Sequence, residues 1–248
     1  MPRFFIENIE KQPGELITVT GQDAVHISKS LRMKAGESLT VCGGMGFDMI
    51  CEITGVNENS VELRVTERKN TESEPNVKIT LYQGLPKGDK LELIIEKTIE
   101  LGVCEIVPVL MQRSVSRPDA KSAAKKHERY SKQAVSAAKQ CGRGIIPAIS
   151  MMMTFSYMLR EIKKHQAVIF FYECGGESLS TVVETIKNTG ATDIAIVIGP
   201  EGGFDPSEAE SLQSAGAFTA TLGKRILRTE TAPIAAVAAI MYATGNMD

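Results

Sequence analysis

Residues 194–208 read Ile194-Ala195-Ile196-Val197-Ile198-Gly199-Pro200-Glu201-Gly202-Gly203-Phe204-Asp205-Pro206-Ser207-Glu208 and combine three structural signals. Residues 194–198 are uninterruptedly apolar and mostly β-branched, which is typical of a buried strand in a parallel sheet. Residues 205–208 are typical of a helix start, with an N-cap aspartate, a proline at the first helical position and a glutamate three residues after the cap. The glycine loop 199–203 between them is therefore expected at the carboxyl end of a strand, where open α/β sheets bind their ligands.

The chemistry of this first loop argues against a phosphate ligand. A phosphate cradle needs backbone N–H groups aimed at an anion, usually with a lysine nearby. Pro200 removes one donor, and the carboxylate of Glu201 would repel a pyrophosphate. The glycines Gly199, Gly202 and Gly203 instead permit close approach of a flat ligand that lacks phosphates and tolerates negative charge. S-adenosylmethionine, an adenosine that carries a cationic sulfonium, meets these conditions. A tight turn without any ligand is the alternative interpretation.

A second loop is broken by a glycine and reads Leu222-Gly223-Lys224-Arg225-Ile226-Leu227-Arg228-Thr229-Glu230-Thr231-Ala232. A strand over 218–222 is expected before it. A small, apolar helix that runs to about Ala243 is expected after it, with Thr229 or Thr231 as the cap. Arg228 lies just before this helix start, where a cation is disfavoured. A compensating partner or a function is therefore expected for Arg228, and a solvated charged loop is the alternative.

The two loops together resemble a known pair of motifs. GPEGGF at 199–204 and LGKRILRTETA at 222–232 are similar to the C-terminal signatures of the SPOUT superfamily of knotted RNA methyltransferases. Within that superfamily the resemblance is to the RsmE type, which methylates N3 of a uridine in 16S ribosomal RNA. The similarity extends over nearly the whole chain, with further landmarks at 3–5, 26–32, 85–90, 97–103, 112–114 and 137–143.

The resemblance implies an α/β protein in two parts. Residues 1–70 correspond to a small PUA-like β-barrel that binds RNA, 71–76 to a linker, and 77–248 to a parallel-sheet SPOUT methyltransferase domain with a C-terminal trefoil knot. The residue pattern agrees, because short alternating segments precede residue 70 and apolar runs alternate with helical segments beyond residue 76. The strands of a small antiparallel barrel are expected at 4–6, 16–19, 38–41, 49–53 and 61–65. Parallel strands are expected near 77–83, 104–110, 167–172, 193–198 and 217–222, and helices near 89–101, 119–140, 155–165, 178–188, 206–214 and 230–244.

The resemblance also implies a cofactor, S-adenosyl-L-methionine, and a set of site residues. The cofactor-binding residues expected are Gly199, Pro200, Glu201, Gly202, Gly203, Leu222, Gly223, Ile226, Leu227, Arg228 and Thr231. Uridine N3 is a poor nucleophile until it loses its proton, so the site must stabilise the charge that develops on the flanking carbonyl oxygens. The guanidinium of Arg228 suits that task. Glu201 and Glu230 are the candidate general bases, acting directly or through water. The alternative is that both glutamates serve as structural hydrogen-bond acceptors.

The charge distribution contains one basic segment. The chain has a net charge of −2, but residues 111–147 hold nine lysines and arginines against two acidic residues. Lys121, Lys125 and Arg129 recur every four residues and would form one stripe on a helix, which is the expected footprint of RNA phosphate contacts. An ordinary solvated helix face is the alternative. Other candidate RNA contacts, from the resemblance, are Arg3, Arg32, Lys87, Arg113 and Arg143.

The remaining composition limits the cellular setting and the partners. Five scattered cysteines and three distant histidines predict free thiols in a reducing cytosol and no metal centre. No secretory signal and no apolar segment of about 18 residues is present, so a cytoplasmic protein without a membrane partner is expected. The expected partners are 16S rRNA or the small ribosomal subunit and, by the resemblance, a second copy of the chain in a homodimer. A SPOUT methyltransferase of another RNA position and a non-catalytic RNA-binding protein are the alternatives.

Overall fold

The computed structural model describes residues 1–7 and 9–247. The described residues divide into two compact units, one from 1–74 with 138–146 and the other from 75–137 with 147–248. Segment 138–146 includes the end of a long helix, and no feature of its sequence indicates that it groups with the N-terminal strands. The boundaries expected at residues 70 and 76 for functional domains stay a prediction.

The N-terminal unit contains one curled sheet. Its strands lie in the order β1-β3-β4-β5-β2, as follows: β1 (Arg3–Phe5), β2 (Leu16–Thr20), β3 (Ser38–Cys42), β4 (Phe47–Val56) and β5 (Ser60–Asn70). The strand positions are confirmed, but the antiparallel barrel is wrong. Strands β1 and β3 are parallel, and no β1–β2 pair closes the sheet among the described residues. Helix α1 (Gly21–Val25) and the π-helical turn His26–Ser30 bury Ala24 and Ile27 in the sheet core, so a helical segment completes this core in place of a closing strand pair.

The second unit is built on a parallel sheet, as expected from the alternating pattern. The strands in chain order are β6 (Lys78–Gly84), β7 (Glu105–Leu110), β8 (Ala148–Ile149), β9 (Met153–Thr154), β10 (Ala167–Phe171), β11 (Glu177–Ser178), β12 (Asp193–Ile198) and β13 (Phe218–Thr221). The order across the sheet is β11-β13-β10-β12-β6-β7-β8, with β9 beside β7. The apolar run 194–198 lies in β12, in the middle of the sheet, where all five side chains are buried.

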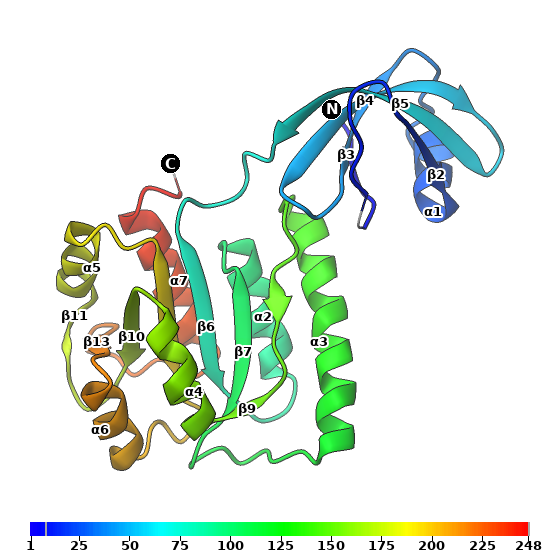
Figure 1. Cartoon of the computed structure of the whole chain (residues 1–248). Helices are drawn as coiled ribbons and strands as arrows, with labels where there is room; N and C mark the ends of the chain where they lie inside the picture. Colours follow the sequence, from blue (N-terminus) through cyan, green and yellow to red (C-terminus); the bar gives the residue numbers. More distant parts are fainter. Residues whose placement is uncertain (8, 248) are drawn as a thin grey trace. The chain divides into compact units, whose positions relative to one another are not determined.

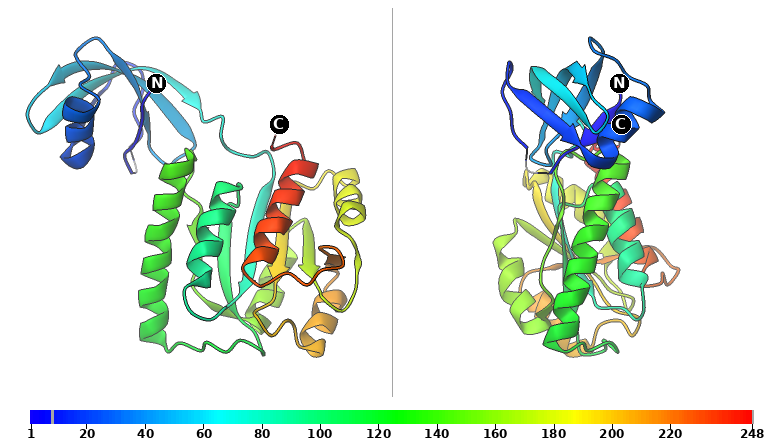
Figure 2. Two further views of the ribbon diagram at one scale, coloured as in Figure 1. Left: turned by 180° about the vertical axis from the view of Figure 1, so that it is seen from behind. Right: turned by 90° about the vertical axis from the view of Figure 1, so that its right-hand side faces the viewer.

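Helices cover both faces of this sheet (Figures 1 and 2). They are α2 (Lys90–Glu100), α3 (Ala120–Cys141), α4 (Phe155–Glu161), α5 (Leu179–Asn188), α6 (Pro206–Ser214) and α7 (Thr231–Ala243). Helices α2 and α7 lie together on one face, and α4 and α6 lie on the other. The start of α6 is the expected capping box, formed by Asp205 and Glu208 with Pro206 in the first turn.

The strand order brings several loops to one edge of the sheet. Strands β13, β10, β12 and β6 are neighbours and parallel. The segments that follow them therefore leave the sheet side by side at its carboxyl edge. Both glycine loops are among these segments, and their proximity follows from the topology.

Candidate active site

A cleft of about 640 Å³ opens at this edge of the sheet. Its volume lies within the range of about 300–1,000 Å³ that is usual for small-molecule sites. Its walls come from the segments after β10, β12 and β13 and from the start of α2. Ten of the eleven expected cofactor-binding residues line it, namely Gly199, Pro200, Glu201, Gly202, Gly203, Leu222, Gly223, Ile226, Leu227 and Arg228. Thr231 does not line it.

The carboxyl end of β10 and the start of α2 also line the cleft, and the sequence prediction omitted both. The end of β10 contributes Phe171, Tyr172 and Glu173, and the start of α2 contributes Lys90. The strand expected at 167–172 was the sequence signal for this part of the wall, since parallel strands end at the same edge of the sheet. The pair Gly175-Gly176 follows it closely but belongs to neither of the two motifs, so the strand order was needed to place this segment beside the two loops.

The first loop packs directly against β6. A Cβ atom added at Gly84 would lie 2.5 Å from the backbone nitrogen of Pro200, so only glycine leaves room for the loop there. Gly203 has a φ of +67°, which favours glycine, and a Cβ at that position would collide with the Glu173 carboxylate. The Arg113 Nη1 atom donates a hydrogen bond to the Gly202 carbonyl over 3.1 Å. The loop conformation is therefore fixed from several sides.

A buried hydrogen-bond chain joins the second loop to the first. The Thr229 hydroxyl donates to the Gly199 carbonyl over 2.8 Å, and Gln83 Nε2 donates to the same hydroxyl oxygen over 3.1 Å. Gln83 and Thr229 are buried. The predicted threonine cap of the last helix is wrong, because Glu230 occupies the N-cap position of α7 and makes no side-chain capping bond. The Thr229 hydroxyl bonds the first loop instead.

Three cations of the second loop line the cleft: Lys224, Arg225 and Arg228. All three are exposed. Among the described residues, none of them has an ion-pair partner within 4.0 Å. The backbone carbonyl of Arg228 accepts the amides of Thr231 and Ala232 and so forms the first turn of α7, while its side chain stays available to a ligand.

The two candidate bases share one lysine. Lys90 Nζ lies 3.0 Å from Glu201 Oε1 and 3.2 Å from Glu230 Oε2. Burial raises the pKa of Glu201, but hydrogen bonds from its own backbone amide, from the Lys90 side chain and from the Lys87 amide outweigh burial and leave the pKa below its ordinary value. Glu201 is therefore ionised at neutral pH. Glu201 lines the cleft and Glu230 does not.

Six of the candidate RNA contacts are exposed: Arg32, Lys87, Arg113, Lys121, Lys125 and Arg129. Arg129 also pairs with Glu92 on α2 over 2.6 Å. Arg32 has a φ of 54°, and no other non-glycine residue in the described part of the chain is left-handed. Strained backbone of this kind is concentrated at functional sites.

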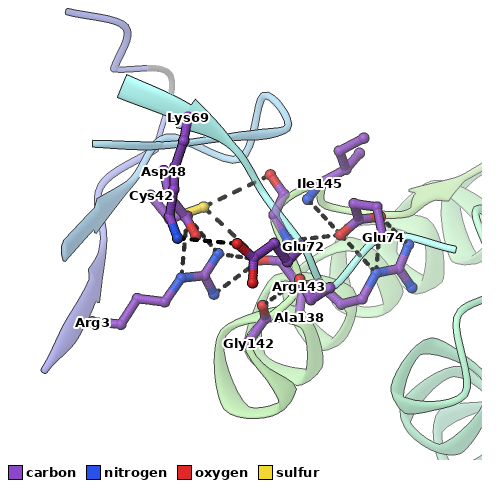
Figure 3. A network of polar contacts seen from close by, with 12 residues as sticks. Arg3, Cys42, Asp48, Lys69, Glu72, Glu74, Ala138, Gly142, Arg143 and Ile145 are labelled. Carbon is purple, nitrogen blue, oxygen red and sulfur yellow. Dashed lines mark hydrogen bonds and ion pairs between the residues drawn. The ribbon is translucent and has the colours of Figure 1, made fainter. Parts of the chain in front are cut away.

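The other two candidate RNA contacts have protein partners inside the N-terminal unit (Figure 3). Arg143 is 4% exposed, and its guanidinium donates to both carboxylate oxygens of Glu74 over 2.8–3.1 Å. Arg3 pairs with Asp48 over 2.9 Å and donates to the Arg143 carbonyl over 3.4 Å. Both guanidinium groups thus stabilise this unit, and contact with RNA stays a prediction.

Residues 1–7 and 9–247 contain neither a candidate membrane span nor a candidate metal site. No helix there combines the length and the apolar character that a bilayer crossing requires. No three side chains among its histidines, cysteines, aspartates and glutamates are grouped as metal ligands.

Comparison with known proteins identifies the family of the chain. The sequence profile of a family described as "RNA methyltransferase domain" matches residues 72–241, and that of "RNA methyltransferase PUA domain" matches 19–66. The chain is 37% identical to the ribosomal RNA small subunit methyltransferase E of Bacillus subtilis, over 98% of this chain and 97% of that protein.

Two similar solved structures contain a bound ligand. The ribosomal RNA small subunit methyltransferase E of Neisseria gonorrhoeae bound to S-adenosyl methionine has a TM-score of 0.83 and 28% identity, over 98% of this chain and 97% of that one. A Legionella pneumophila structure with bound S-adenosylmethionine has a TM-score of 0.80 and 30% identity, over 97% of both chains. Since a family profile matches more than half of the chain and the identity to the Bacillus subtilis protein extends over nearly all of it, the chain belongs to the ribosomal RNA small subunit methyltransferase E family of RNA methyltransferases.

Proposed function

We propose that the protein transfers the methyl group of S-adenosylmethionine to N3 of a uridine in 16S ribosomal RNA. The observation that carries this proposal is the cleft, in which the two glycine loops that follow β12 and β13, on either side of β10, meet beside the exposed guanidinium of Arg228. The near-complete coverage of the Bacillus subtilis relative supports the same activity. Ribosomal RNA as substrate also favours a cytoplasmic location.

The residues of the cleft fit S-adenosylmethionine. Glycine backbone and the apolar side chains of Ile198, Leu222 and Leu227 form walls suited to a flat adenosine. The carboxylates of Glu173 and Glu201 on the wall suit the cationic sulfonium, and no phosphate cradle surrounds Pro200. The cations of the cleft come from the second loop and from Lys90. The cofactor supplies a methyl group on a positively charged sulfur, which is a good leaving group.

Arg228 acts on the base in this proposal. The methyl acceptor has to lie in line with the bond that breaks, about 3–3.5 Å from the methyl carbon. Deprotonation of N3 places negative charge on the two flanking carbonyl oxygens, and the Arg228 guanidinium donates hydrogen bonds to that charge. Its position on the wall of the cleft allows it to orient the uracil as well. Glu201 and Glu230 are the candidate bases for the N3 proton, with a purely structural role as the alternative.

Replacement of Arg228 by alanine tests this assignment. Loss of one preorganised donor to a developing oxyanion costs about 10²–10³ in rate. We therefore expect the single-turnover rate of RNA methylation by Arg228→Ala to fall by about 100-fold or more. Calorimetry should show S-adenosylmethionine affinity close to that of the wild type, because the backbone of residue 228, and not its side chain, is expected to hold the cofactor. Arg160→Ala, on α4 outside the cleft, is the matched control. Methylation by Arg228→Ala at the wild-type rate would contradict the role of Arg228.

We also propose how the chain divides this work. Residues 1–70 act as the RNA-binding domain, 71–76 as the linker and 77–248 as the catalytic domain. The exposed basic residues Arg32, Lys87, Arg113, Lys121, Lys125 and Arg129 contact RNA phosphates. Their charges would draw a polyanion to a protein whose net charge is −2.

A trefoil knot and a homodimer complete the proposal. The contact of Thr229 with Gly199, and the space that Gly84 leaves for Pro200, support a chain that passes closely behind the first loop, as in a knot. Helix α7 is apolar on every side, yet Tyr242 is 72% exposed. The neighbouring helix α2 exposes Leu93, and the second loop exposes Ile226. Exposed apolar side chains on these three elements, of the kind that protein interfaces cover, support a second copy of the chain against α7.

A further inference from the structure

Lys90 has no role in the methyl transfer described above, although it lines the cleft. It is the first residue of α2, where the partial positive charge of the helix N-terminus makes a lysine unfavourable. The Lys90 ammonium meets the carboxylates of Glu201 and Glu230 at 3.0 Å and 3.2 Å. Two negative partners offset the unfavourable position, so the ion pairs explain why the helix begins with a cation.

The two carboxylates belong to different loops. Glu201 lies in the first loop, between β12 and α6, and Glu230 ends the second loop at the N-cap of α7. The backbone amide of Lys87 also donates to Glu201, over 3.1 Å. The segment 87–90 thus holds both loops from a third element, next to the cleft that the loops enclose.

Without the ammonium, two negative side chains would remain close together. Their side chains are 28% and 17% exposed, so water screens them only in part. The hydrogen bond to Glu201 is the main cause that raises the pKa of Lys90 above its ordinary value, so the lysine stays charged at neutral pH. The lowered pKa of Glu201 makes it a weaker base than a free glutamate. These charge states favour ion pairing over proton transfer for Glu201.

We infer that Lys90 is a positioning residue, which fixes the two glycine loops against each other through Glu201 and Glu230. This inference rests on the proposed function of the cleft as the cofactor site. It gives both glutamates the role of structural acceptors. Lys90 acts through the loops and not on the ligand, because an ammonium beside a sulfonium would repel it.

A comparison of two ligands separates these possibilities. S-adenosylmethionine carries a positive sulfur, whereas S-adenosylhomocysteine carries a neutral one. Calorimetric titration of the full chain with each ligand gives their dissociation constants. We expect Lys90→Met to weaken both by the same factor, about tenfold, as for the loss of one partly exposed charged contact. Lys90→Arg keeps a cation between the glutamates and should recover most of the affinity. Lys97→Met, on the outer face of the same helix, should bind both ligands as the wild type does.

Each outcome has one meaning. Equal weakening by Lys90→Met, with rescue by Lys90→Arg and an unchanged circular dichroism spectrum, supports the positioning role. Wild-type affinity of Lys90→Met for both ligands overturns it, and so does a change for S-adenosylmethionine alone, since that indicates direct action on the sulfonium. Failure of the wild-type chain to bind S-adenosylmethionine is a separate result, which counts against the proposed function itself.

Discussion

The hydroxyl group of Thr229 connects the two loops that line the cleft. It donates to Gly199 and accepts from Gln83, and all of these contacts are buried. Such a group is costly to lose, because the buried Gly199 carbonyl would keep only a long, 3.5 Å hydrogen bond from Gln83 Nε2. The same hydroxyl fixes the backbone of Gly199, a residue that lines the cleft.

Thr229→Val keeps the shape of the side chain and removes the hydroxyl. We expect it to destabilise the protein by about 1–2 kcal/mol, because the Gly199 carbonyl loses its short hydrogen bond while Gln83 Nε2 keeps its bond to the Gly84 carbonyl. Each kcal/mol lowers the thermal midpoint by about 2–4 °C in a protein of this size, which differential scanning calorimetry measures. Thr229→Ser keeps the hydroxyl and is the control. A midpoint for Thr229→Val equal to that of the control would show that this hydrogen-bond chain does not stabilise the fold.

At the scale of single residues, most of the cleft was predicted from the sequence, because glycine permits a close backbone approach, proline removes a donor, and both loops resemble known motifs. The sequence did not reveal how the residues are partnered. The burial of Arg143 against Glu74 and the pairing of Lys90 with two glutamates join positions far apart in the chain. Such contacts depend on the order of strands and helices in space, which local patterns do not specify.

Among the elements, the start of α6 determines how the first loop ends. Glu208 is 5% exposed, and its carboxylate accepts the Asp205 amide over 3.1 Å and the Gln112 amide over 2.8 Å. One side chain thus caps the helix and ties it to the segment after β7. A glutamine at this position has one acceptor oxygen in place of two.

Glu208→Gln is therefore expected to leave one of the two backbone amides without its acceptor. The expected loss of stability is about 1–2 kcal/mol, which thermal unfolding detects as a lower midpoint. Glu210→Gln changes the same charge at an exposed position of α6 and serves as control. Equal midpoints for the two variants would mean that the Glu208 contacts do not stabilise this junction.

Elements with a strong periodic pattern were predicted well, and the short ones were not. The long helices and the main strands begin and end within a few residues of the expected positions, since apolar periodicity and the capping box act locally. Strands β8, β9 and β11 have two residues each, too few to show a pattern. The N-terminal sheet differs from a barrel because Ala24 and Ile27 of a helical segment fill its core, and the sequence pattern contained no sign of that packing.

At the scale of the whole molecule, the proposed homodimer gives a reason for the exposed apolar side chains around α7. Tyr242→Glu places a charge where the proposal expects a buried aromatic contact. Loss of a tyrosine hot spot of about 2 kcal/mol weakens association by about 30-fold. Sedimentation velocity should therefore show a shift from dimer to monomer.

Tyr157→Glu, at an exposed position of α4, is the control for this prediction. A wild-type chain that is monomeric at every concentration would contradict the homodimer, and an unchanged dimer of Tyr242→Glu would remove α7 from its interface.

We propose that this protein as a whole methylates N3 of a uridine in 16S ribosomal RNA with the help of Arg228. The most direct measurement is mass spectrometry of nucleosides from the 16S RNA of cells that lack the protein. We predict the loss of one 3-methyluridine, its return with the wild-type chain, and no return with Arg228→Ala. An unchanged amount of 3-methyluridine in the cells that lack the protein would contradict the account.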